Sequence, residues 1–226
     1  ETREYIPVFA PISNIIFWIN QGSGIKTYEY IKANAPYAKI VFCDENLGVW
    51  ARFAHALNAK TEFTVIFDDD TIPGKRWIEN CMDQMSRIEA LYGTVGLIYN
   101  SEKHYLDNNR YGWPSANSSS IQVDIVGHSW FFKTNWLKQY LIEKEDIAGL
   151  DFCGEDMHFS YALQKIGIPT FVPPHPIEDK ELWGSIKGYE KGSGKEAISI
   201  SGKGSMMDYP LKQLIKRGFR LLKSGD

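Results

Sequence analysis

The 226-residue chain carries 25 Lys and Arg against 28 Asp and Glu, a formal net charge of −3, so no basic field favours a nucleic-acid partner. No apolar run approaches the roughly 18–20 residues that would span a bilayer, and we expect no signal peptide in the first residues. Three widely spaced cysteines, Cys43, Cys81 and Cys153, fit neither a disulfide framework nor a zinc site. Buried thiols favour a cytoplasmic protein, with a luminal domain of a secretory-pathway enzyme as the alternative.

Short apolar runs alternate with helical patterns along the chain. We expect strands at 15–19, 39–43, 63–67, 95–99, 123–126, 129–132 and 170–172, and helices at 27–35, 48–59, 73–88 and 155–166. This alternation is typical of an α/β fold in which helices cover both faces of a mostly parallel central sheet.

By composition, the whole chain divides into three segments. We predict a single catalytic domain over 1–182, followed by a flexible Gly/Lys-rich loop over 183–205 that could serve as a lid. The segment 206–226 contains a basic amphipathic helix. We expect it to pack on the domain with its basic face in solvent, rather than to touch a membrane.

Three of the predicted strands end in polar residues. Asn20 follows the first, the segment 44–46 with Asn46 follows the second, and Asp68, Asp69 and Asp70 follow the third. Ligands of open α/β sheets bind beyond the carboxyl ends of the strands, so these residues should share one rim of the sheet.

The three consecutive carboxylates after the apolar run FTVIF are the strongest chemical signal. They repel one another, and a divalent cation held by Asp68 and Asp70 would remove that repulsion. The alternative is an Asp-rich entry to the helix that starts near Pro73. A haloacid-dehalogenase-type phosphatase also ends a strand with two such carboxylates, but its pattern places Thr one position later than Thr71.

A second acidic site, GEDMHF, opens the predicted helix at 155–166. Acidic residues in a first turn are favoured by the helix dipole, which is the purely structural interpretation of Glu155 and Asp156. The functional interpretation is that Gly154 lets them project into a cleft, where a carboxylate could deprotonate an acceptor hydroxyl as general base.

The motifs FDDDTIPG, GHSWFFK and GEDMHFSYALQKIG, in this order over roughly residues 15–175, resemble nucleotide-sugar glycosyltransferases of the glycosyltransferase-A fold. Both the family 2 enzymes and the exostosin-type transferases are similar. The resemblance implies a single Rossmann-like domain and a UDP-sugar donor. It also implies Mn²⁺ or Mg²⁺ as cofactor, and a glycan or glycoconjugate acceptor.

The resemblance also implies roles for single residues. Asp70 would ligate the metal that bridges the donor diphosphate, Asp68 would contact the ribose or the waters of the metal, and Asp69 would lie nearby. Asp156 would be the general base, with Glu155 beside it. Further donor-site residues are Asn20 at the base, Asn46 and Arg52 at the nucleoside and phosphates, and Gly127 in the GHSW segment. His175 is a candidate metal ligand, and His128 would lie near a sugar.

The expected activity is therefore metal-dependent transfer of a sugar from a nucleotide-diphosphate sugar to a hydroxyl group. A sugar-phosphate nucleotidyltransferase and a non-catalytic carbohydrate-binding module are the alternatives. The expected partners are the nucleotide sugar, the acceptor and further domains of a longer chain, but no nucleic acid.

Overall fold

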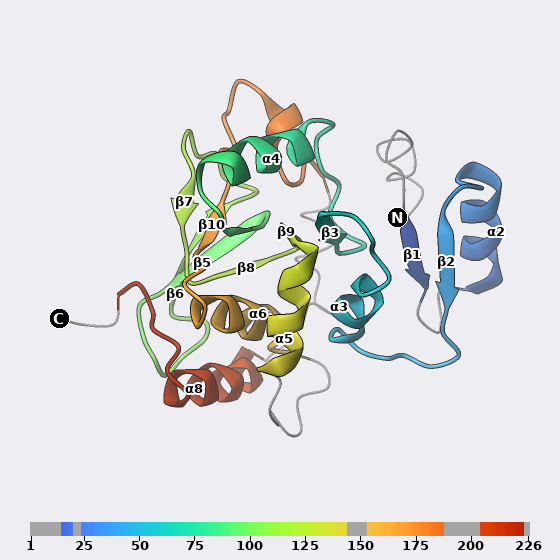
Figure 1. Ribbon diagram of the computed structural model, residues 1–226. Coiled ribbons are helices and arrows are strands. Elements are labelled where there is room, and N and C mark those ends of the chain that lie inside the picture. Colours follow the sequence, from blue (N-terminus) through green and yellow to red (C-terminus); the bar gives the residue numbers. More distant parts are fainter. Residues whose placement is uncertain (1–14, 20–23, 144–152, 188–203, 224–226) are drawn as a thin grey trace.

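The computed structural model describes residues 15–19, 24–143, 153–187 and 204–223 (Figure 1). Its helices are α2 (Gly24–Asn34), α3 (Ala51–Ala56), α4 (Trp77–Arg87), α5 (Leu137–Ile142), α6 (Glu155–Gln164) and α8 (Asp208–Lys216). Its strands are β1 (Ile16–Ile19), β2 (Lys39–Phe42), β3 (Phe63–Phe67), β4 (Leu91–Tyr92), β5 (Val95–Tyr99), β6 (Asn108–Gly112), β7 (Ile121–Gln122), β8 (Ile125–Gly127), β9 (Ser129–Lys133) and β10 (Thr170–Val172). Within the described residues, every helix is too short or too polar to cross a membrane.

The central sheet has five strands in the order β3-β9-β4-β10-β7. β4 and β10 run parallel, whereas β9 is antiparallel to both β3 and β4, and β7 is antiparallel to β10. The sheet is therefore mixed, and the prediction of a mostly parallel sheet is corrected. The reason is that β9 lies between β3 and β4 and runs opposite to both, which interrupts the parallel arrangement of β3, β4 and β10.

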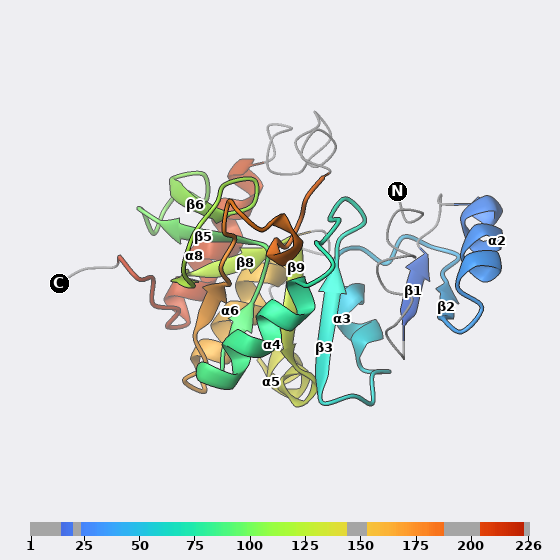
Figure 2. The same cartoon turned by 90° about the horizontal axis from the view of Figure 1, so that it is seen from above.

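Two smaller sheets accompany it. β6, β5 and β8 form an antiparallel sheet. β1 and β2, which precede and follow α2 in the sequence, pair with each other in parallel. In both views this βαβ unit lies beyond α3, on the side of the molecule away from α8, and α3 lies beside β3 (Figures 1 and 2).

Aromatic side chains of β9 alternate between the two faces of the sheet. Phe131 stacks on Phe63 of β3 on one face, with ring centroids 5.5 Å apart. Phe132 contacts Phe159 of α6 on the opposite face, as the period-2 geometry of a strand requires. Helix α4 lies on one side of the sheet and α5 and α6 on the other (Figure 1), so helices cover both faces as predicted.

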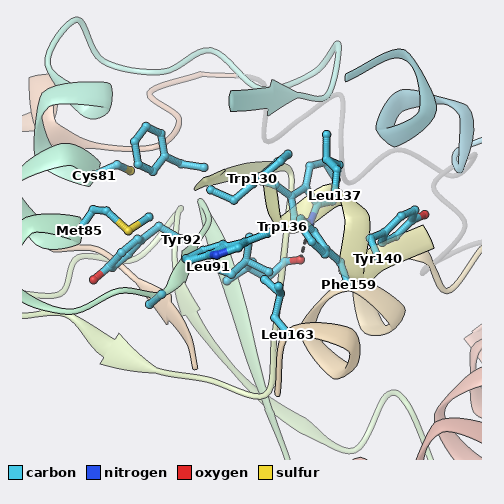
Figure 3. Close-up of a cluster of buried hydrophobic side chains, with 14 of the residues drawn as sticks. Cys81, Met85, Leu91, Tyr92, Trp130, Trp136, Leu137, Tyr140, Phe159 and Leu163 are labelled. Atoms are coloured by element: carbon cyan, nitrogen blue, oxygen red, sulfur yellow. Dashed lines mark hydrogen bonds between the residues drawn. The ribbon is translucent and has the colours of Figure 1, made fainter. Parts of the chain in front are cut away.

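The main core cluster extends from α4 across the sheet strands β4 and β9 to α3, α5 and α6 (Figure 3). Phe53 of α3 is fully buried, and its ring centroid lies 5.4 Å from Trp130, 4.7 Å from Tyr140 and 5.1 Å from Phe159. These tilted and edge-on contacts are the arrangements that aromatic rings prefer. They fix α3 against the sheet, and with it the adjacent Arg52.

Helix α6 is buried nearly all round because α8 covers a second side of it. Met157 and Tyr161 of α6 share a buried cluster with Leu211 and Leu214 of α8. The segment after α8 is tied down as well, since the side-chain amide of Gln164 exchanges two hydrogen bonds with the backbone of Arg220.

The core contacts of Phe53 predict a large loss of stability on truncation. Phe53→Ala removes three ring contacts from a fully buried site, and we expect the free energy of unfolding to fall by about 3–5 kcal/mol. Leu57→Ala, at a half-exposed position just after the same helix, should change it by less than about 0.5 kcal/mol. Urea unfolding of both variants measures this, and equal losses would contradict the proposed anchoring of α3.

Candidate active site

The carboxylates after β3 sit in a turn that is fixed by the sheet. The backbone N–H of Asp68 donates to the carbonyl of His128 (3.0 Å), which extends the β3–β9 ladder by one residue. The N–H of Thr71 then donates to the carbonyl of Asp68 (3.1 Å) and closes a turn. In this turn Asp68 and Asp70 are each about a quarter exposed, whereas Asp69 lies at the surface.

The chain beyond the turn is held by the segment 181–187. The Gly74 N–H donates to the carbonyl of Trp183 (2.9 Å), and the Ile186 N–H donates to that of Ile72 (2.8 Å). The Ser185 hydroxyl accepts from the Ile72 N–H (3.1 Å). Trp183 to Ser185, at the start of the segment predicted as a flexible loop, are buried; residues 188–203 lie outside the described part of the chain.

Three metal-ligating side chains converge at the turn. Potential ligand atoms of Asp68, Asp70 and His128 all lie within 4.8 Å of one another, and the Nδ1 atom of His128 is 3.6 Å from Oδ1 of Asp70. Burial alone would raise the pKa of Asp70, but the adjacent imidazole of His128 and the Thr71 hydroxyl outweigh it and hold this pKa below its usual range. Two carboxylates and an imidazole form a donor set that suits Mn²⁺, and the carboxylates alone suit Mg²⁺.

The second pair of carboxylates opens α6. Gly154, which precedes the helix, has φ 88°, and a Cβ there would lie 3.0 Å from Pro210 of α8. Glycine therefore allows both the left-handed turn and the close approach of α8. Oδ1 of Asp156 accepts a hydrogen bond from the Met157 N–H (2.7 Å), and Oδ2 lies 3.8 Å from the position a Cβ of Gly127 would take.

Arg52 stands between the two acidic groups. Its guanidinium pairs with Asp68, lies 3.9 Å from Oε1 of Glu155, and rests 5.1 Å from the ring centroid of Trp130. Burial would lower the pKa of Arg52, but the charges of Asp68, Glu155 and Asp156 hold it above its ordinary value. Arg52 therefore stays a cation that neutralises part of the acidic site.

Burial dominates the protonation of the acidic groups near Arg52. It raises the pKa of Glu155 to about 8, with the charge of Asp156 adding to the rise and Arg52 opposing it. Burial also raises the pKa of Asp156 to about 6, opposed by the Met157 N–H and by Arg52. The two neighbouring carboxyl groups are therefore both harder to ionise than ordinary carboxylic acids, Glu155 more so than Asp156.

The structure brings together most of the residues that the motifs singled out, from Asp68 to Asp70, Glu155 and Asp156, with Arg52 and Gly127 beside them. Asn46 is exposed in its loop, where its side-chain oxygen accepts from the Gly48 N–H (3.0 Å). Asn20 lies outside the described residues.

His175, expected as a metal ligand, is occupied elsewhere. It is fully buried; its Nδ1 lies 2.8 Å from the carbonyl of Pro173, and its Nε2 accepts from the Gly184 N–H (2.8 Å). Burial lowers the pKa of His175 to about 4, so the ring is neutral and holds the segment behind the Asp turn. His128 takes the place beside the carboxylates, and the position of this histidine directly between two short apolar strands was the available signal.

The structures of other proteins support the fold assignment, whereas their sequences show no match. No protein-family model and no curated protein sequence matches the chain. The crystal structure of GalNAc-T7 with UDP, GalNAc and Mn²⁺ is similar, with a TM-score of 0.52 and 14% identity over 71% of this chain. The match spans 35% of that chain, about a third of its length. HddC from Yersinia pseudotuberculosis gives a TM-score of 0.42 and 10% identity over 75% of each chain, too weak a likeness to carry an inference. The fold is thus glycosyltransferase-like.

The raised pKa of Glu155 predicts a stability that falls as pH rises. Between about pH 4.5 and 8 the folded protein holds a proton on Glu155 that the unfolded chain releases, so rising pH favours unfolding. In Glu155→Gln this contribution is absent. We therefore expect the melting temperature of the variant, relative to that of the parent, to increase as pH rises from 5 to 8.

Thermal unfolding at pH 5, 6.5 and 8 measures the effect. Glu62→Gln, at an exposed position, should give a curve parallel to that of the parent. A melting-temperature difference between Glu155→Gln and the parent that is constant over this range would show that Glu155 titrates normally.

Proposed function

We propose that the protein is a metal-dependent glycosyltransferase that moves a sugar from a nucleotide-diphosphate sugar, with UDP the favoured nucleotide, to a hydroxyl group of a glycan or glycoconjugate. The observation that carries this proposal is the meeting of two acidic sites 85 positions apart in the sequence, the turn after β3 and the start of α6, with Arg52 between them. The glycosyltransferase-like fold supports it, and so does the presence of UDP and Mn²⁺ in the GalNAc-T7 structure.

The turn after β3 would hold the donor. Asp68 and Asp70 would bind a divalent cation, which supplies charge neutralisation for the leaving diphosphate. Their partial exposure fits such a site, because a cation held by one or two carboxylates takes its remaining ligands from water and phosphate. Asp69, which is exposed in the same turn, would contact the donor from the solvent side.

The start of α6 would act on the acceptor. Asp156 has the properties of a general base, since its raised pKa makes it more basic than an ordinary carboxylate while leaving it ionised at neutral pH. Gly127 beside it carries no side chain, so an acceptor hydroxyl can approach Oδ2 from that direction. Glu155, whose pKa burial raises further, would lie beside Asp156 in the site.

Arg52 would serve both halves. Burial raises the pKa of Asp68, and the pairing with Arg52 opposes that rise. A guanidinium also matches the geometry of phosphate oxygens, so Arg52 can share its donors between Asp68 and the diphosphate of a bound donor.

Substitution of the two acidic sites should have different kinetic effects. With Mn²⁺ and a panel of UDP-sugars, we expect Asp70→Ala to lower the rate at which UDP is formed from the UDP-sugar by more than about 100-fold. The same variant should bind both Mn²⁺ and UDP more weakly than the parent. Asp156→Asn should lower kcat of transfer about 10²–10⁴-fold while the affinity for UDP with Mn²⁺ stays close to that of the parent.

Asp83→Asn on the exposed side of α4 is the matched control and should leave transfer unchanged. If Asp70→Ala binds Mn²⁺ and UDP as tightly as the parent, the proposal is wrong. Release of pyrophosphate from a nucleoside triphosphate and a sugar phosphate would instead identify a nucleotidyltransferase. Glycan binding indifferent to metal and nucleotide would identify a binding module.

A further inference from the structure

A histidine stands beside the two carboxylates of the turn after β3. We propose that His128 is a third protein ligand of the divalent cation, through Nδ1, and that its imidazole makes the site prefer Mn²⁺ to Mg²⁺ and Ca²⁺. The inference rests on the cation site of the proposed function and deepens it by naming the class of metal.

The backbone delivers His128 and Asp68 to the same place. His128 is the single residue between β8 and β9, and it follows Gly127 directly. Phe67 pairs with Ser129 across the ladder, and the next rung is the hydrogen bond from the Asp68 N–H to the His128 carbonyl. The register of two antiparallel strands therefore sets the spacing of the two side chains, and no mobile loop is involved.

The distances allow one ion to reach both Asp70 and His128. Nδ1 of His128 lies 3.6 Å from Oδ1 of Asp70, less than twice the metal–ligand distance of about 2.1 Å that such ions take. The Thr71 hydroxyl lies 3.5 Å from the same nitrogen. The Trp113 ring meets the imidazole edge-on at 5.7 Å between centroids, which restricts its orientation.

The backbone of His128 carries a conformational cost that needs a reason. Its φ is 64°, and among the described residues His128 is the one non-glycine residue with a positive φ. Glycine would adopt this conformation without the cost, and strain of this kind gathers at ligand sites where the surrounding structure enforces it. A ligand role for the imidazole gives the position a physical reason to hold a side chain.

The chemistry of the donor set predicts the selectivity. Carboxylate oxygens suit Mg²⁺, Ca²⁺ and Mn²⁺ alike, whereas an imidazole nitrogen favours transition metals over the alkaline earths. The ratio of Mn²⁺ to Mg²⁺ affinity should therefore depend on His128, and the carboxylates should contribute to both.

The test uses Mn²⁺ itself as the probe, added to the metal-free protein with and without UDP. Bound Mn²⁺ is counted by electron paramagnetic resonance, its nitrogen ligand is detected by ¹⁴N electron spin-echo modulation, and Mg²⁺ affinity is obtained by competition. We expect the parent to show a directly bound ¹⁴N and to bind Mn²⁺ at least about tenfold more tightly than Mg²⁺.

Two variants remove the ligand without threatening the fold. His128→Gly relieves the positive φ, and His128→Asn retains a residue that tolerates it. Both should keep the parental melting temperature or exceed it, lose the ¹⁴N signal, and bind Mn²⁺ about tenfold more weakly, with Mg²⁺ affinity changed less than about threefold. His104→Ala, at an exposed histidine beside Asp208, is the control and should change neither affinity.

Several outcomes would overturn the inference. These are a parent that binds no Mn²⁺ with or without UDP, bound Mn²⁺ without a ¹⁴N ligand, a ¹⁴N signal that survives in His128→Gly, and equal losses of Mn²⁺ and Mg²⁺ affinity. If the parent shows the ¹⁴N ligand but transfers no sugar, the proposed function fails and the role of His128 stands. If transfer depends on Asp70 while the bound metal has no nitrogen ligand, the proposed function stands and the role of His128 fails.

Discussion

Repulsion among converging carboxylates is the constraint on which the site depends. Asp68, Asp70, Glu155 and Asp156 approach one another in a partly buried region where charge is poorly solvated. Three features of the described structure reduce this repulsion: Arg52 supplies a cation, the imidazole of His128 lies beside Asp70, and burial raises the pKa of Glu155, which favours its neutral form. A divalent cation would complete this neutralisation.

The packing of the core fixes the positions of these charged groups. Phe53 is locked among aromatic rings, so α3 presents the neighbouring Arg52 at a fixed point over Trp130. The β3–β9 ladder fixes Asp68 against His128, and the contact of α8 with Gly154 fixes the start of α6. Each charged group thus belongs to a rigid element, which is what an electrostatic site requires, because the groups need not reorganise during reaction.

The local elements of the site could be read from the sequence, but their pairing could not. The apolar run at 63–67 matches β3, and the periodicity at 155–166 marks α6, because burial imposes periods of two and 3.6 on these segments. Strand direction leaves no such trace, so the antiparallel course of β9 escaped prediction. The positive φ of His128 and the hydrogen bonds of the His175 ring to the backbone arise from tertiary contacts, which leave no pattern in the sequence.

The indole of Trp130 belongs to two systems at once. Its edge is part of the aromatic core around Phe53, its N–H donates to the Val126 carbonyl (3.0 Å), and Arg52 rests on its ring. Folding and charge placement therefore cannot be tuned separately at this position. A smaller residue would loosen the core and also displace the guanidinium. Substitutions that change the ligand preference of such a protein should therefore occur at positions around Trp130 and leave Trp130 itself unchanged.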